Sequence, residues 1–510
     1  MARLVVIGGV AAGMSAAAKA RRTNPELEII VYTEEKHISY GACGLPYYIS
    51  GEIEQESRLI ARTIEQFAAQ QIKVYPRHRV DKLNPASQTI QVVSLETGEQ
   101  TEVSYDSLVI ATGASALIPP VPGRARPGVF KLRNVEDGMA IRRYIEEKKP
   151  RSGVIVGGGY IGLEMVETLH RHGLSVTVVE MAPQIVPNMD EDMAALVQQY
   201  LIDRGIQVFT QEKVLALVGE EVAANDNRAA GDQLRTTLDA GPGNAAVDLV
   251  QGKTAVDLVQ GKAALVQGKA ADASLTRPQE MGDIGFSPVR RVLTDRRELA
   301  AELVILATGV IPNTRLAQAA GIELGVRQAI RVNNRMATSV HGIYAAGDCA
   351  VATHLVTGEE VYIPLGTTAN KQGRTAGENA AGGNAVFKGV VGTGIAKVLE
   401  LEIARTGLTE RECLLKNISY STKTIRSKTR AGYYPGAANI HLKVIAEKPS
   451  GRLLGAQIVG YTGAGKRIDV FAAALTLGAK LEQLKDLDLA YAPPFSPVYD
   501  PILIAINQFF

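Results

Sequence analysis

The chain has 510 residues, of which 46% are hydrophobic and 21% charged, and its 55 Lys and Arg nearly balance 53 Asp and Glu. This length suggests about three domains, and the balanced charge excludes a basic surface for nucleic acid or for a membrane. Three cysteines cannot form a disulfide framework, which favours a reducing environment. No apolar run approaches the roughly 20 residues that a membrane helix needs. We therefore expect a soluble, cytoplasmic protein.

The chain opens with an apolar strand at Arg3–Ile7, a glycine-rich turn at Gly8–Gly13 and a helix from Met14. The same order of strand, turn and helix returns at Gly153–Val156 and Gly157–Gly162, about 150 residues further on. This spacing is typical of the opening of a dinucleotide-binding βαβ unit. We therefore expect two nucleotide-binding domains, and we prefer this interpretation of the N-terminal residues to a secretion signal.

The second glycine turn has the complete pattern Gly157-x-Gly159-x-x-Gly162. A pyrophosphate group binds backbone N–H groups at a helix N-terminus, and glycines permit this close approach. Glu180 follows the next strand, SVTVV, where a carboxylate can bind ribose hydroxyls. That carboxylate repels a 2′-phosphate, and the next arginine lies 24 residues further on. The sequence therefore predicts NADH rather than NADPH.

The first glycine turn is less complete, because Val10 stands between Gly8 and Gly13 where a middle glycine is expected. The strand EIIVYT leads to Glu34, the candidate carboxylate for the ribose of this first nucleotide. Further along, the segment TSVHGIYAAGDCA places Asp348 in a tight turn after a strand. A carboxylate in such a turn can bind the ribityl hydroxyl chain of a flavin. The first nucleotide is therefore predicted to be FAD.

Two further strands end alike, in LVIATGA and in LVILATGV. We expect their ends to contact the cofactors, through Ala111, Thr112 and Gly113 for FAD and through Gly309 for NADH. After Ala385, alternating apolar residues predict an antiparallel sheet with helices. The predicted fold class is α/β, with two Rossmann-like domains and a C-terminal α+β domain. The expected ranges are 1–112 and 311–385 for FAD, 113–310 for NADH, and 386–510 for the C-terminal domain.

Residues 219–287 interrupt this order with the repeats AVDLVQGK, AVDLVQGK and ALVQGK. Periods of nine and seven residues are too short for a solenoid repeat, which needs roughly 20 residues. We interpret the segment as a tandem duplication within a surface hairpin loop. A partner-binding arm is the alternative interpretation.

The two glycine turns, the two ATG segments and the GD segment together resemble the flavoprotein disulfide reductases that bind two dinucleotides. The resemblance covers nearly all of the chain except residues 219–287. It implies an FAD domain, an NADH domain and a C-terminal domain that forms a homodimer. It also implies that the segment SYGACGLPYYISG, which contains Cys43, lies beside the flavin.

Cys43 differs from the dithiol members of this superfamily, which carry a second cysteine five positions on, where Tyr48 stands here. The C-terminal His–Glu pair of those enzymes is also missing, because His441 is the last histidine. A single thiol can still alternate between a thiolate and a mixed disulfide, or between a thiolate and a sulfenate. The spacing of Ser39, Cys43 and the following Pro-Tyr-Tyr resembles the coenzyme A-disulfide reductases and related persulfide reductases. We expect Cys349 to be a packing residue and Cys413 to lie at the surface.

Further roles are implied by this resemblance. The segments RAGYYPGA and YAPPFSPVYDP resemble those whose tyrosines approach the active cysteine from the partner subunit, which points to Tyr433 and Tyr491 as catalytic residues beside Cys43. The other implied roles are a gate over the nicotinamide for Tyr160, the nicotinamide–flavin contact for Glu164, a helix start at the flavin ring for Thr367 and Ala369, and coenzyme A binding for Lys19, Arg22 and Ser39. No metal site is predicted.

The sequence thus predicts an NADH-dependent FAD enzyme that reduces coenzyme A disulfide, or a similar low-molecular-weight disulfide or persulfide, through Cys43. One alternative is an NADH oxidase or peroxidase that uses a Cys43 sulfenate. In that group a histidine stands in the first glycine turn, at the position of Ala11 here. A second alternative is a flavoprotein that delivers electrons to, or signals with, a protein partner.

Overall fold

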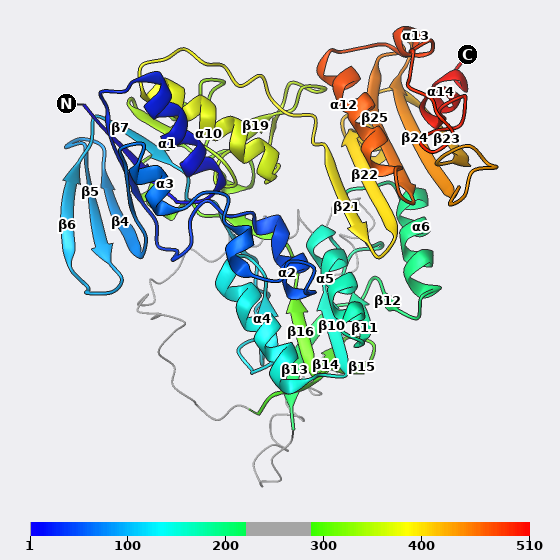
Figure 1. Cartoon of the computed structure of the whole chain (residues 1–510), viewed down its shortest axis with the longest axis horizontal. Helices are drawn as coiled ribbons and strands as arrows, with labels where there is room; N and C mark the ends of the chain where they lie inside the picture. The colour runs from blue at the N-terminus through cyan, green and yellow to red at the C-terminus, as the bar shows by residue number, and fades with distance from the viewer. Residues whose placement is uncertain (1, 221–286) are drawn as a thin grey trace, which may run out of the picture.

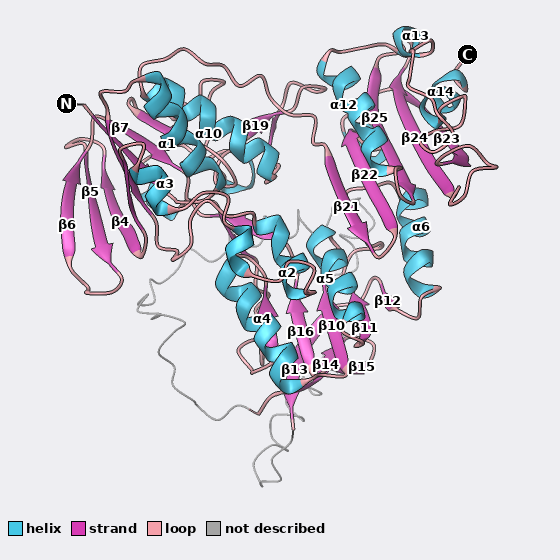
Figure 2. Cartoon of the chain, in the orientation of Figure 1, coloured by secondary structure: helices cyan, strands magenta, loops and turns pink. Residues whose placement is uncertain are grey.

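The computed structural model describes residues 2–220 and 287–510. Figure 1 shows an N-terminal unit, a middle unit below it and a C-terminal unit beside them, and Figure 2 shows that each combines a sheet with helices. None of the helices in the described ranges is both long and apolar enough to cross a membrane.

The N-terminal unit is built on a parallel sheet with the strand order β18-β7-β1-β2-β3. Helices α1 and α10 lie side by side against it (Figure 1). They approach closely because a Cβ on Gly373 or Gly377 of α10 would lie 2.2 or 2.1 Å from a backbone oxygen of α1. The elements are β1 (Arg3–Ile7), α1 (Ala11–Thr23), β2 (Glu28–Tyr32), α2 (Leu45–Ile49), α3 (Ile64–Ala68), β3 (Ile72–Tyr75), β7 (Ser107–Ile110), α9 (Arg315–Ala319), β18 (Ile343–Ala345) and α10 (Gly366–Ala380).

Smaller sheets flank this unit. An antiparallel sheet is formed by β4 (His78–Asn84), β5 (Thr89–Ser94) and β6 (Gln100–Ser104). Where the chain passes to and from the middle unit, β8 (Ala114–Ala116) pairs antiparallel with β17 (Val310–Pro312). A short hairpin joins β19 (Ala352–Thr353) and β20 (Glu360–Val361). Because β18 lies in the same sheet as β1, β2, β3 and β7, the N-terminal unit is formed from two separate segments of the chain. The exact domain boundaries that we predicted remain a proposal.

The middle unit repeats this design with the strand order β12-β11-β10-β16-β9, again parallel. Its elements are β9 (Val129–Lys131), α4 (Val135–Lys148), β10 (Ser152–Val156), α5 (Tyr160–Arg171), β11 (Ser175–Val179), α6 (Glu191–Ile202), β12 (Gln207–Phe209) and β16 (Leu303–Leu306). Both helices that follow a glycine turn start earlier than the sequence indicated; α1 begins at Ala11 rather than Met14, because the third glycine of the turn already lies in the helix.

An antiparallel sheet on the middle unit carries the repetitive segment. It consists of β13 (Val214–Gly219), β14 (Val289–Thr294) and β15 (Glu298–Ala300). Gly219 pairs with Val289 in an antiparallel register, so the residues on either side of the repetitive segment lie in adjacent strands. Residues 221–286 themselves lie outside the described residues.

The C-terminal unit is the predicted antiparallel sheet, with the strand order β21-β22-β25-β24-β23. Its core is formed by buried side chains of β24, β25 and α12. The elements are β21 (Gly394–Val398), β22 (Leu401–Gly407), α11 (Glu410–Leu415), β23 (Tyr420–Lys428), β24 (Asn439–Glu447), β25 (Leu453–Gly460), α12 (Ile468–Thr476), α13 (Leu481–Leu484) and α14 (Pro501–Asn507).

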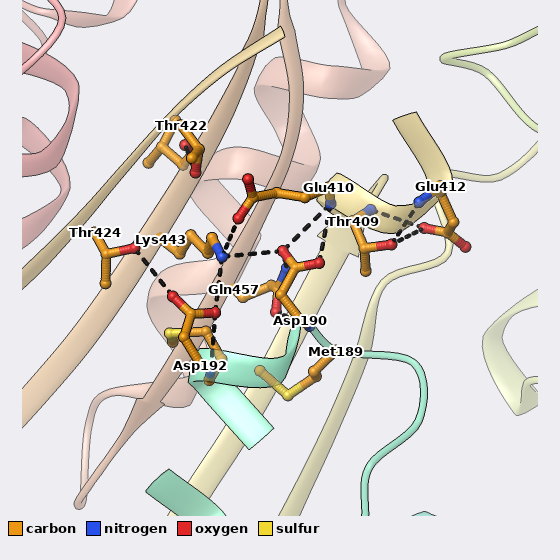
Figure 3. A network of polar contacts seen from close by, with 12 residues as sticks. Met189, Asp190, Asp192, Thr409, Glu410, Glu412, Thr422, Thr424, Lys443 and Gln457 are labelled. Carbon is orange, nitrogen blue, oxygen red and sulfur yellow. Dashed lines mark hydrogen bonds and ion pairs between the residues drawn. The ribbon is translucent and has the colours of Figure 1, made fainter. Parts of the chain in front are cut away.

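A buried charge cluster joins the middle and C-terminal units (Figure 3). The Lys443 side chain on β24 is only 4% exposed and forms ion pairs with Asp190, Asp192 and Glu410, at 3.4 Å for Asp190 and 2.7 Å for Asp192. Gln457 on β25 donates to Asp190 at 2.5 Å and accepts from its backbone N–H at 2.8 Å. Asp190 directly precedes α6, so the cluster fixes the start of that helix against the C-terminal sheet.

Candidate active site

The two glycine turns share one backbone design. Gly8 and Gly157 have φ values of +118° and +109°, which favour glycine. A Cβ on Gly8 would lie 2.1 Å from the carbonyl oxygen of Ala111, and one on Gly157 would lie 2.3 Å from that of Ala307. The first and last residues of each turn therefore need glycine for steric reasons, and each turn packs on the ATG segment of its own sheet.

The helices that follow these turns have free N-termini. Val10 and Gly159 occupy the N-cap positions of α1 and α5, and in the described chain neither helix has a capping side chain or an acidic residue in its first turn. Nothing described lies within 4 Å of where a Cβ on Gly159 would stand. The backbone N–H groups and the positive end of each helix are therefore available to a pyrophosphate. Both turns fit a dinucleotide.

Glu180 lies beside the second turn, as predicted for a ribose ligand. Its carboxylate accepts hydrogen bonds from the backbone N–H groups of Gly158 and Ala182, each at 2.7 Å. These bonds hold the carboxylate at the carboxyl end of β11, next to the start of α5. The residue thus supports the turn as well as offering oxygen acceptors to a bound ligand.

The corresponding position in the first turn differs from our prediction. Gly8 donates to the carbonyl of Tyr32 as Gly157 donates to that of Val179, each at 2.8 Å. The counterpart of Glu180 is therefore the buried Thr33. Glu34 lies one residue further along and is exposed, so a hydroxyl replaces the carboxylate at this point.

Asp348 lies in the predicted tight turn, after Gly347 with φ +83°. Its carboxylate pairs with the guanidinium of Arg133 at 2.9 Å. Sequence reasoning missed Arg133, because it belongs to no motif and precedes α4 by two residues. The carboxylate can accept hydrogen bonds from a polyhydroxyl chain, and the guanidinium can donate to such a chain or to a phosphate.

The other predicted flavin residues surround this turn. Helix α10 has no capping side chain among the described residues; Thr367 is exposed in its first turn and Ala369 is buried against Gly347. The Thr112 hydroxyl donates to the carbonyl of Asn313 at 2.6 Å, which fixes the first ATG segment. Gly113, predicted for FAD, and Gly309, predicted for NADH, both have positive φ values. The uncapped N-terminus of α10 is open to an anionic ring.

Cys43 lies in a single helical turn, Ala42–Gly44, directly before α2, and it is exposed. Desolvation by the surrounding protein nevertheless raises the pKa of its thiol, and the carboxylates of Glu164 and Asp348 raise it further. Arg133 acts in the opposite direction. The electrostatic partners of Cys43 are therefore residues of both predicted cofactor sites, and in this single chain its thiol is not poised as a thiolate.

Glu164 approaches the cysteine segment from helix α5. One helical turn further along, the Thr168 hydroxyl donates to the carbonyl of Pro46 on α2 at 3.1 Å, so these two helices pack together. Burial, and then the charge of Glu167, raise the pKa of Glu164 to about 7. Burial and Glu164 also raise the pKa of Tyr47 to about 12. A carboxyl group beside Cys43 can therefore exchange a proton near neutral pH.

Tyr433 and Tyr491 are brought together, although 58 residues separate them. Their hydroxyls lie 3.4 Å apart, and this contact raises the pKa of Tyr491. Tyr433 lies between β23 and β24, and Tyr491 lies between α13 and α14. The two side chains are 78% and 43% exposed, so the pair faces outward from the C-terminal unit.

The predicted substrate residues differ in what surrounds them. Lys19 forms an ion pair with Glu378 of α10 at 2.7 Å, which gives its charge a structural partner. Arg22 lines a hollow of about 370 Å³ together with Arg21, Ala69, Gln70 and Gln71. Ser39 has φ +47°, and its backbone N–H donates to the carbonyl of Gly9 at 2.8 Å. Arg22 thus borders a hollow, whereas the charge of Lys19 already has a partner.

The other two cysteines are buried. Cys349 is fully buried, and its thiol lies 3.5 Å from the carbonyl of Ile110, so the expectation of a packing role is confirmed. The expectation that Cys413 lies at the surface is wrong. Its side chain is fully buried in the core of the C-terminal unit, because α11 turns this face inward while Leu414 and Leu415 remain exposed.

These features define a class of protein: an oxidoreductase with two dinucleotide-binding units, an exposed thiol whose electrostatic partners belong to both, and a separate C-terminal unit. Comparison with family models gives the particular family. Residues 2–250 and 273–373 match the pyridine nucleotide-disulphide oxidoreductases, and residues 394–501 match their dimerisation domain. The chain belongs to the pyridine nucleotide-disulphide oxidoreductase family. It is a flavoprotein enzyme that uses FAD and a reduced pyridine nucleotide, and its fold class is confirmed.

Curated relatives align over almost the full length. An NADH oxidase of Methanocaldococcus jannaschii is 36% identical, with 99% of this chain and 98% of the relative covered. An NAD(P)H coenzyme A polysulfide/persulfide reductase of Pyrococcus horikoshii is 33% identical, with 98% and 97% covered. A coenzyme A disulfide reductase of Staphylococcus epidermidis is 29% identical, with 98% of each chain covered. The resemblance inferred from sequence is confirmed.

A solved structure supports the same relationship. The NAD-dependent persulfide reductase from A. fulgidus superposes with a TM-score of 0.83 at 35% identity. The alignment covers 99% of this chain and 82% of that one.

Proposed function

We propose that this enzyme uses NADH to reduce coenzyme A disulfide, or a similar low-molecular-weight disulfide or persulfide, through Cys43. The observation that carries the proposal is the position of Cys43. It is an exposed thiol whose electrostatic partners are Asp348 and Arg133 on the flavin side and Glu164 on the nicotinamide side. The names of the relatives from Pyrococcus horikoshii and Staphylococcus epidermidis support a coenzyme A-linked sulfur substrate.

The chemistry requires one thiol to act twice. As a thiolate, Cys43 attacks one sulfur of the substrate disulfide, forms a mixed disulfide and expels a thiolate, which takes up a proton. Bound FAD supplies the route by which a hydride from NADH becomes the electron pair that cleaves this mixed disulfide. Cleavage frees the second thiol and restores Cys43. In total, one NADH, one disulfide and one proton give NAD⁺ and two thiols.

The surroundings of Cys43 imply that it needs help to lose its proton. Its pKa is raised in the single chain, and Glu164, with a pKa of about 7, is the nearby carboxyl group that can accept a proton. The phenol hydroxyls of Tyr433 and Tyr491 can donate hydrogen bonds to sulfur. We infer that the dimerisation domain brings this tyrosine pair of one subunit to Cys43 of the other.

Arg22 is the favoured ligand for the phosphate groups of coenzyme A. It borders a hollow that Arg21, Gln70 and Gln71 also line, and arginine binds phosphate through two parallel hydrogen bonds. Lys19 can contribute only if it leaves its ion pair with Glu378. Replacement of Arg22 by Ala is therefore expected to weaken the binding of coenzyme A disulfide more than the binding of a small disulfide such as cystine.

Oxygen reduction is a second candidate, because the relative from Methanocaldococcus jannaschii is named an NADH oxidase. Here Cys43 would alternate between thiolate and sulfenate. The intact mass of protein purified without reductant separates the candidates. A coenzyme A adduct on Cys43 supports the disulfide reductase, added sulfur the persulfide route, and one added oxygen the oxidase.

Replacement of Cys43 by Ser tests the thiol mechanism. The variant is expected to keep its flavin and its reduction by NADH, because those sites are built from other residues, while turnover of coenzyme A disulfide falls to background. Turnover at the wild-type rate would exclude the mechanism and favour an electron carrier for a protein partner.

A further inference from the structure

The Tyr160 ring lies against the C-terminal unit. Tyr160 is the first residue of α5, and its ring covers Gly394 at the start of β21. A Cβ on Gly394 would lie 3.0 Å from Cε2 of this ring and 3.3 Å from its hydroxyl oxygen. The hydroxyl is buried, and burial raises its pKa. The tyrosine is therefore a neutral ring whose outer edge rests on a residue without a side chain.

Strand β21 is held against α5 by a buried carboxylate. Glu167 is 3% exposed and accepts hydrogen bonds from the Lys397 ammonium and from the backbone N–H of Leu399, each at 2.9 Å. Figure 1 shows β21 lying beside α5 along this contact. Arg405, the cross-strand partner of Gly394, donates to the carbonyl of Asn188 in the middle unit at 2.7 Å. The distance between Gly394 and the tyrosine is thus fixed at both edges of the hairpin.

A neighbouring face and the C-terminal end of α5 contact the cysteine segment. Thr168 bonds to Pro46, and the His172 ring lies 2.8 Å from the carbonyl oxygen of Ile49. A single helix therefore connects the C-terminal sheet, the nicotinamide side of the site and the segment that carries Cys43.

We propose that Gly394 is a positioning residue for NADH binding: β21 is the support that sets the resting position of the Tyr160 ring. The proposal rests on the proposed function and on the gate role over the nicotinamide that the family resemblance implies for Tyr160. A side chain at position 394 would require the ring to move by a few tenths of an ångström or more away from β21, and we infer that this moves it toward the nicotinamide. Gly394 has no positive φ value, so alanine at this position changes the contact without straining the backbone.

The test uses Gly394→Ala and Gly394→Val in the holoenzyme, each alone and combined with Tyr160→Ala. The equilibrium dissociation constant of NAD⁺ is measured by calorimetry, and reduction of the flavin by NADH is followed in anaerobic rapid mixing. We expect Gly394→Ala to raise the dissociation constant by about fivefold or more, the effect of a mild overpacking, and Gly394→Val to raise it further. The rate at which coenzyme A disulfide reoxidises the reduced enzyme is expected to stay unchanged. As a control, the unfolding temperature of each variant is measured to establish that it is folded.

The double variants decide the cause. In the Tyr160→Ala background both substitutions at Gly394 are expected to have no effect, since there is no ring to displace. An effect that persists there, or wild-type binding in Gly394→Ala, overturns the proposal while leaving the proposed function intact. Wild-type NAD⁺ binding and flavin reduction in Tyr160→Ala alone would instead remove the gate role of the tyrosine, and this inference with it.

Discussion

Glu164→Gln tests whether the carboxyl group beside Cys43 is kept at a cost to stability. Burial raises its pKa from 4.5 to about 7, so the folded chain binds this proton more tightly than the unfolded chain. Stability therefore falls as the pH rises from about 4.5 to about 7, and the loss is complete above that range. At about 1.4 kcal/mol for each pKa unit, the cost at pH 8 is about 3 kcal/mol. Glutamine keeps the shape and carries no charge.

Urea unfolding of both proteins at pH 4.5 and pH 8 measures this cost. Relative to the wild type, Glu164→Gln is expected to gain about 3 kcal/mol between the two pH values, because the groups whose pKa Glu164 raises, Cys43 and Tyr47, titrate above pH 8. Glu147→Gln, at an exposed glutamate of α4, is the matched control and is expected to show no such gain. A gain that is absent, or equal in the control, would refute the placement of a buried carboxyl group here.

The same substitution has a functional consequence. Because the charge of Glu164 raises the pKa of the Cys43 thiol, its removal is expected to lower that pKa. The rate of alkylation of Cys43 by iodoacetamide against pH reports the change, since the thiolate is the reactive form. A pKa of Cys43 that rises or stays unchanged in this variant would contradict the electrostatic interaction between the two groups.

Three further substitutions test other parts of the molecule. Glu180→Ala is expected to raise the Michaelis constant for NADH about ten- to a hundredfold and to relax the rejection of NADPH, since it removes a charged acceptor; unchanged kinetics with both nucleotides would place the ribose elsewhere. Tyr433→Phe with Tyr491→Phe is expected to slow disulfide turnover about 100-fold while flavin reduction by NADH persists; mixed dimers with Cys43→Ser chains should recover activity, and no recovery in proven heterodimers contradicts action across subunits. Lys443→Met leaves Asp190 buried without its cation and is expected to cost about 3–5 kcal/mol in urea unfolding; a loss under 1 kcal/mol would show that the cluster is solvated.

Features that depend on local backbone geometry could be predicted from the sequence. Gly8 and Gly157 were identified because their turns require glycine, and Asp348 because it follows a strand and a tight turn. The repeat of strand, glycine turn and helix was enough to predict two parallel sheets, and the later change of pattern was enough to predict the antiparallel sheet that follows them. In each case a short stretch of sequence contains the whole structural requirement.

Features that depend on pairs of distant side chains could not be predicted. Arg133 meets Asp348 across 215 residues, and Lys397 meets Glu167 across 230, with no pattern near either partner that indicates the other. Cys413 was misplaced because its charged neighbours suggest a surface, whereas the helical period turns this one side chain inward. The pKa of Glu164 depends on how much of α2 and α5 covers it, which only packing determines.

The single chain is incomplete around its thiol, and the exposed surface of the C-terminal unit indicates how it is completed. Cys43 has a raised pKa, and the acid–base groups that the described chain places near it are Glu164 and the high-pKa phenol of Tyr47. The tyrosine pair of the C-terminal unit is exposed, and Phe495 and Val498, in the same loop segment as Tyr491, are each 75% exposed. Apolar side chains exposed to this degree favour burial against another surface. Because residues 394–501 match a dimerisation domain, we propose that this exposed surface binds the second subunit and brings a proton donor to its cysteine. Dimer formation and catalysis would then depend on the same contact, so weakening the interface should lower disulfide turnover before it lowers flavin content.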